Sequence, residues 1–126
     1  MQNIRPLLFI LWTASLTLVA IGSLTPGTNT PPPFPMADKL LHMAAYAWLA
    51  ALALKVFLAR QVAFTCAWGM ILFGAALEVA QSFVPLRSPS LGDIAVNILG
   101  VCIGVLIGQR LKAREHDRKM DEILRR

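Results

Sequence analysis

Four long apolar runs constrain this chain more than any other feature. They cover residues 7–24, 38–58, 62–84 and 90–108, which is most of the 126 residues. A helix of about 20 predominantly apolar residues crosses the hydrocarbon core of a bilayer. A backbone in lipid finds no water to bond, so each run is expected to be helical. The pattern predicts an all-α polytopic membrane protein, a single domain over residues 1–126 built as a bundle of four transmembrane helices.

The first run, 7–24, has a second interpretation. It contains no charged residue and follows Arg5, as the apolar part of a removed signal peptide follows a basic start. The run is long, however, no small-residue cleavage site stands out, and three further runs follow. A retained first helix is therefore favoured.

Prolines mark the connections between the runs. Residues 25–35 contain five prolines and a glycine, which predicts an extended loop. Pro85 is expected to end the third helix, and residues 85–89 to form a short turn before the fourth.

The basic residues predict the orientation of the bundle. One side holds Arg5, Lys55, Arg60 and the seven Lys and Arg residues of the tail 110–126, while the other holds only Lys39 and Arg87. Such a bias marks the cytoplasmic side, so both termini are expected in the cytoplasm. The net charge of +5 lies mainly in the tail, expected to continue as a helix, and not along a groove. We therefore expect membrane lipid as a partner and no nucleic acid.

The glycines of the fourth run form two overlapping GxxxG steps, Gly100, Gly104 and Gly108. Small residues at this spacing let two helices approach closely in lipid. Either the glycines pack against another helix of the same bundle, or they form the face of a homodimer.

Polar and ionisable side chains recur at one end of the last three runs and in the turn between the third and fourth. At a rise of about 1.5 Å per residue they lie at a similar depth, toward the outer face. Ionisable groups in a span normally face the bundle interior, so we expect one pocket open to the outside. The candidate ligand-binding residues are Asp38, Lys39, His42, Tyr46, Glu78, Gln81, Arg87, Asp93 and Asn97.

Most of these residues also have a purely structural interpretation. Asp38 begins a helix and can be its N-cap, and Ser90 with Asp93 resembles a capping box. Lys39 can snorkel to the interface. Simple packing, interhelical hydrogen bonds or an exposed loop position are open for His42, Tyr46, Gln81, Arg87 and Asn97.

Glu78 differs because it lies well inside an apolar run, where no helix-end argument explains a carboxylate. A structural ion pair with Arg87, Lys39 or His42 is the alternative to a functional site. The cysteines, Cys66 and Cys102, lack metal-ligand spacing and are expected to be inert core residues. No cofactor and no metal ligand set is assigned from the sequence.

Two segments resemble the VanZ-like family, DKLLHMAAYAWLA from Asp38 and GAALEVAQSFVPLRSPSLGDIAVNILGVCIG from Gly74. The matching positions comprise the nine candidate residues together with Gly74 and Gly100, and the resemblance covers about residues 36–108. It implies a four-helix integral membrane protein of the bacterial envelope, in the inner membrane. The family is named after a member associated with teicoplanin resistance, and this role is not transferred here.

Several functions fit this pattern. The first is binding of a polar lipid headgroup or an envelope precursor in the pocket, with Arg87 and Lys39 on phosphate. The second is an intramembrane enzyme acting on such a lipid, whose carboxylates and histidine could hold a divalent ion. A small transporter or channel subunit is the third, and a structural or assembly role is the fourth.

Overall fold

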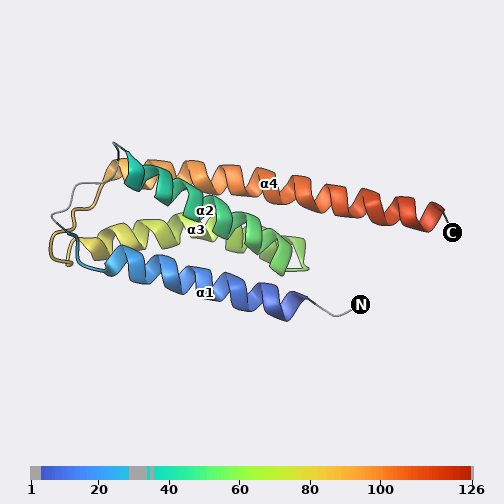
Figure 1. Cartoon of the computed structure of the whole chain (residues 1–126), viewed down its shortest axis with the longest axis horizontal. Helices are drawn as coiled ribbons and strands as arrows, with labels where there is room; N and C mark the ends of the chain where they lie inside the picture. The colour runs from blue at the N-terminus through green and yellow to red at the C-terminus, as the bar shows by residue number, and fades with distance from the viewer. Residues whose placement is uncertain (1–3, 29–33, 35, 126) are drawn as a thin grey trace.

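Four helices of the computed structural model run side by side (Figure 1). The structure describes residues 4–28, 34 and 36–125. Within them, α1 spans Arg5–Leu24, α2 Ala37–Val56, α3 Arg60–Gln81 and α4 Leu91–Leu124. All four have the length and hydropathy to cross a membrane, and this part of the chain contains no strand. The expected all-α, four-helix membrane architecture is confirmed.

The helix boundaries depart from the apolar runs in ways that follow from local chemistry. The helix α3 ends at Gln81, three residues before the expected end at Val84. The amides of Ser82, Phe83 and Val84 each bond the carbonyl three residues back, which tightens the last turn. Pro85 has no amide hydrogen to continue the α-helical pattern. The helix α1 starts at Arg5, two residues earlier than expected, with a proline in its first turn.

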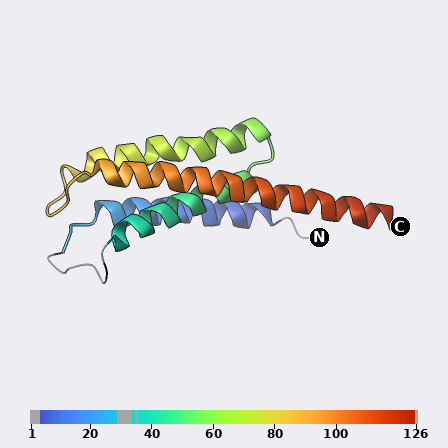
Figure 2. The ribbon, with the colours of Figure 1, turned by 90° about the horizontal axis from the view of Figure 1, so that it is seen from above.

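The helix α2 is central and packs against the other three. Its residues Leu49, Ala50 and Ala53 are fully buried, and Val101 of α4 is buried beside them in the same core. The apolar core thus lies along α2. The four helices lie side by side along the length of the bundle (Figures 1 and 2).

The contact between α2 and α4 is made by backbone. A Cβ atom on Gly100 would collide with the carbonyl oxygen of Met43, and one on Gly104 with that of Ala47. Gly108 is buried against α2 one turn further along. The glycine steps therefore pack against α2 within one chain.

The helix α1 is the least buried of the four. Trp12 is its anchor: the indole Nε1 donates to the carbonyl of Leu49 over 3.1 Å, and the ring packs edge-on against Phe57. A second indole, that of Trp48, donates to Ser15 Oγ over 3.1 Å. Four large apolar side chains of α1 are at least 60% exposed, as expected of a surface that faces lipid; they are Leu7, Ile10, Leu18 and Ile21.

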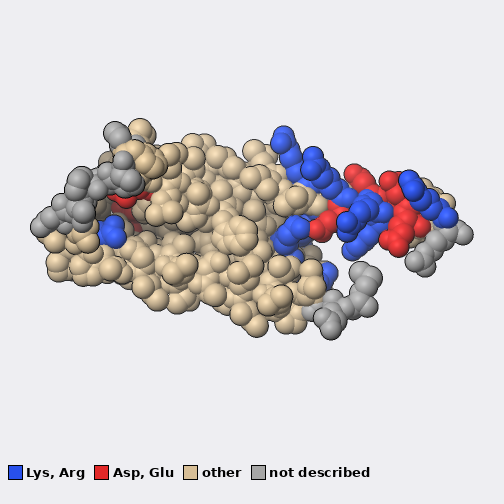
Figure 3. Space-filling model, in the orientation of Figure 1, with Lys and Arg blue, Asp and Glu red and all other residues tan. Residues whose placement is uncertain are grey.

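The two ends of the bundle differ in charge. We call the end with the α1–α2 and α3–α4 connections the site end, and the end with both termini the terminal end (Figure 1). Beyond the terminal end, α4 continues as one uninterrupted helix, and its charged side chains gather there (Figure 3). Its residues 109–124 add about 24 Å at 1.5 Å per residue. The expected helical tail is thus continuous with the fourth span.

Candidate functional site

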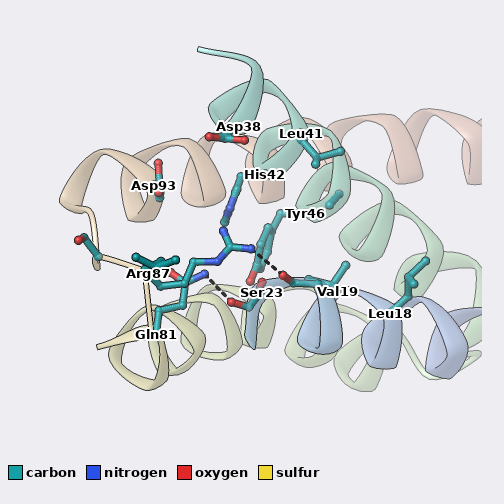
Figure 4. Close-up of a pocket in the computed structure, with 14 residues that line it drawn as sticks. Leu18, Val19, Ser23, Asp38, Leu41, His42, Tyr46, Gln81, Arg87 and Asp93 are labelled. Carbon is teal, nitrogen blue, oxygen red and sulfur yellow. Dashed lines mark hydrogen bonds between the residues drawn. The ribbon is translucent and has the colours of Figure 1, made fainter. Parts of the chain in front are cut away.

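A cavity of about 690 Å³ opens at the site end, between α1, the first turns of α2 and the loop that leads into α4 (Figure 4). One part of its wall is polar and comprises Asp38, His42, Tyr46, Gln81, Arg87, Ser88 and Asp93. Another part is apolar and comprises Leu18, Val19, Leu41 and Ala45. The cavity is therefore amphipathic and is bounded by segments far apart in sequence.

Six of the nine candidate residues line this cavity. The other three lie beside it and contact residues of its wall or of the adjoining loop: Lys39, Glu78 and Asn97. The structure thus brings the predicted residues to one end of the bundle, as a lined cavity with a supporting layer behind it.

An ion pair joins the first turns of α2 and α4. Lys39 Nζ lies 2.8 Å from Asp93 Oδ1, and the Asp93 side chain is only 18% exposed. The snorkelling interpretation has Lys39 extending alone to the membrane interface. Instead, its ammonium is paired with Asp93. Its charge compensates a carboxylate in the cavity wall.

One turn deeper, α2 and α4 meet again through a histidine. His42 Nδ1 lies 3.2 Å from Asn97 Oδ1, and the His42 ring is stacked nearly parallel to that of Tyr46. Asn97 is 2% exposed, and its Nδ2 has no hydrogen-bond partner in the described part of the chain. A Cβ on Gly74 would press on both Asn97 Nδ2 and the Tyr46 ring, so a glycine on α3 makes room for this layer.

Glu78 is 2% exposed, and one of its oxygens, Oε2, accepts a hydrogen bond from the amide of Ser90 over 3.0 Å. Ser90 is the N-cap of α4, with its Oγ accepting from the Asp93 amide. The bond from the Asp93 amide to Ser90 Oγ, half of the expected capping box, is thus present. The other half differs, because the Ser90 amide donates to Glu78 on α3 and not to the Asp93 side chain. Glu78 forms no ion pair among the described residues, so the alternative interpretation, a structural ion pair with Arg87, Lys39 or His42, is not observed there.

The helix α2 begins differently from the structural interpretation of Asp38. Its N-cap residue is Met36, in the left-handed region at φ 67°, and no side chain caps it. The N-cap interpretation of Asp38 is therefore wrong, because the helix starts one residue earlier at Ala37. Asp38 lies inside the first turn and lines the cavity (Figure 4).

Arg87 and Gln81 bind the end of α1. The Arg87 guanidinium donates from Nη2 to the carbonyl of Gly22 over 3.0 Å (Figure 4). Its Nε donates to the carbonyl of Thr25, also over 3.0 Å. Gln81 Nε2 donates to the carbonyl of Ser23 over 3.1 Å. These bonds satisfy carbonyls that a helix C-terminus leaves without partners. The acceptors are backbone atoms of another helix, so no side-chain pattern in the sequence points to them.

The sequence also misses the contribution of α1 to the cavity. Leu18, Val19, Gly22 and Ser23 line it, yet the first run has no charged residue to mark a site. Hydrogen bonds from Gln81 and Arg87 join this helix end to the polar layer.

A family model, VanZ/LLP1, matches residues 3–112. The match extends the resemblance beyond residues 36–108 to include α1 and the start of the tail. No curated protein and no solved structure matches the chain. The matched segment contains the four membrane-spanning segments and the whole polar layer at the site end. The chain belongs to the VanZ/LLP1 family.

Proposed function

We propose that this protein binds a polar lipid, or a lipid-linked envelope precursor, with the headgroup in the cavity at the site end. The amphipathic wall of the cavity carries the proposal. Polar side chains from α2, α4 and the connecting loop line one part, and apolar side chains of α1 and α2 line another. A ligand with a charged head and an apolar body fits both parts at once.

Arg87 supplies the phosphate contact in this proposal. Its bonds to Gly22 and Thr25 use two of the five N–H donors of a guanidinium, so donors are left for a ligand oxygen. Because α1 fixes the guanidinium, little side-chain entropy is lost on binding. Lys39 has a different role from the one first expected, since it neutralises Asp93.

Asp38 adds the opposite charge to the same wall. A headgroup that bears an amine or hydroxyls beside its phosphate would satisfy both Asp38 and Arg87. The class we favour is therefore a lipid whose headgroup combines phosphate with hydrogen-bond donors.

The orientation in the bacterial cytoplasmic membrane is part of the proposal. Ten of the twelve Lys and Arg residues are expected at the terminal end or in the tail, which supports a cytoplasmic location for that end. The cavity then opens to the outer leaflet, where envelope precursors are found.

Native mass spectrometry of the full chain, purified in mild detergent, tests the proposal. We expect one lipid retained by the wild type and a bound fraction at least fivefold lower in Arg87→Gln. Arg60→Gln removes the same charge from the start of α3 at the terminal end and is expected to retain the lipid.

Gln81→Ala separates binding from packing, because it removes a contact to α1 without removing a charge. If Gln81→Ala loses the lipid as fully as Arg87→Gln, the charge of Arg87 is not what retains the lipid. No retained lipid in the wild type, or equal loss in Arg60→Gln, contradicts the proposal.

A further inference from the structure

Three side chains of types that can ligate a metal come from three helices and meet at the cavity wall. A ring nitrogen of His42, a carboxylate oxygen of Glu78 and one of Asp93 all lie within 4.8 Å of one another. They come from α2, α3 and α4 and are separated by long stretches of sequence, so no ligand spacing marks them. Two carboxylates and an imidazole are a donor set for a divalent ion such as Zn²⁺, which binds both nitrogen and oxygen ligands.

The burial of Glu78 points to a cation. Its side chain is 2% exposed and has no ion-pair partner among the described residues. The bond from the Ser90 amide is the one hydrogen bond that this part of the chain gives it. A charged carboxylate away from water is strongly unfavourable unless a counter-charge is close. The Lys39 ammonium acts on Glu78 electrostatically, but it is bonded to Asp93 and not to Glu78. A bound cation would supply a counter-charge in direct contact with Glu78.

His42 is held in the way that metal-binding histidines are held. Its Nδ1 faces the amide oxygen of Asn97, itself buried. When Nδ1 carries the proton and donates to that oxygen, the other ring nitrogen keeps a lone pair. Metal-ligating histidines almost always have such a second partner, which fixes the ring plane.

We propose that His42, Glu78 and Asp93 bind one divalent transition-metal ion, with Asn97 positioning the histidine. His42 and Asp93 also line the cavity, which provides the entry path and room for water to complete the coordination. Lys39 competes with the metal ion, because its ammonium is bonded to Asp93 Oδ1 and its charge repels the ion. The proposal does not rest on lipid binding.

Zn²⁺ alone is the probe, measured by isothermal titration with the full chain in detergent and by elemental analysis after dialysis. We expect one ion per chain and at least tenfold weaker affinity in both His42→Gln and Glu78→Gln. The matched control is His116→Gln, since His116 is the other histidine of the chain and lies in the α4 tail. This control is expected to bind as the wild type does.

Lys39→Met sharpens the test, since it removes the competing cation and is expected to strengthen binding by severalfold. Thermal unfolding without metal shows which variants fold. If Glu78→Gln does not fold, His42→Gln and Lys39→Met still test the proposal. No bound ion in the wild type overturns the proposal. Equal weakening by His116→Gln also overturns it, by placing the ion on the tail.

Discussion

The helices α4 and α1 both pack on α2, but by opposite means. Glycines of α4 lie directly on α2 carbonyls, and no side chain separates the two backbones at Gly100 and Gly104. The helix α1 is far less buried. Hydrogen bonds to carbonyls help to join it to its neighbours: Trp12 of α1 donates to Leu49 of α2, and Arg87 donates to Gly22 at the C-terminal end of α1.

The difference teaches how the cavity is built. The wall formed by α2 and α4 carries the Lys39–Asp93 and His42–Asn97 contacts and rests on close backbone packing. The wall formed by α1 is apolar and mostly exposed toward lipid. The polar wall formed by α2 and α4 is thus held by close backbone packing, whereas the apolar wall formed by α1 is held in place by a few hydrogen bonds.

The largest expected effect tests the backbone contact. Gly104→Ala should destabilise the fold by about 1–3 kcal/mol, because the added Cβ overlaps the backbone oxygen of Ala47, which cannot rotate away. Gly69→Ala is the matched control on α3: nothing lies within 4 Å of its Cβ, so it should be neutral or stabilising by up to about 1 kcal/mol. Thermal unfolding in detergent measures both. The same sign of change in the two variants would break the comparison.

An intermediate effect is expected at the anchor of α1. Trp12→Phe removes the bond to the Leu49 carbonyl and should cost about 0.5–1.5 kcal/mol. Trp68→Phe, on a half-exposed side chain of α3, serves as the control and should change stability little. Protease sensitivity of the α1–α2 loop should rise in Trp12→Phe only. If Trp12→Phe is destabilised but the protease sensitivity of its α1–α2 loop is unchanged, the Trp12 bond does not specifically hold α1 against the bundle.

The smallest effect is expected where α2 and α4 meet at the terminal end. Lys55 Nζ pairs there with Glu115 Oε1, and the hydrogen bond from Lys55 lowers the pKa of the Glu115 carboxyl. The pair therefore stabilises the fold above the ordinary pKa of a glutamate and is lost as the pH falls through the lowered value. Exposed pairs contribute about 0–1 kcal/mol, so Glu115→Gln should remove only a small acid-dependent change in unfolding temperature. Asp117→Asn should leave that change intact.

Much of the fold follows from the sequence, because the apolar runs leave a chain in lipid few alternatives. The four spans agree with the predicted runs within a few residues, and α3 ends before Val84 because bonds to the carbonyl three residues back tighten its last turn. The polar residues were assigned to one end because their depth follows from the helical rise.

Their partners could not be predicted in the same way. Glu78 accepts from the amide of Ser90, and Arg87 donates to carbonyls of α1. Such contacts depend on which backbone atoms a neighbouring helix presents, and residue types do not encode this. Nor does the spacing within any one run bring His42, Glu78 and Asp93 together, since each lies on a different helix.

The glycine contacts also restrict how α2 and α4 can slide. Each four-residue step in α4, from Gly100 to Gly104, is matched by a four-residue step in α2, from Met43 to Ala47. A shift of less than a turn would press a side chain into a carbonyl, so the helices have discrete registers about 6 Å apart. A one-turn shift would separate Lys39 from Asp93. Register, set by residues that bear no functional group, thus decides whether the polar layer exists.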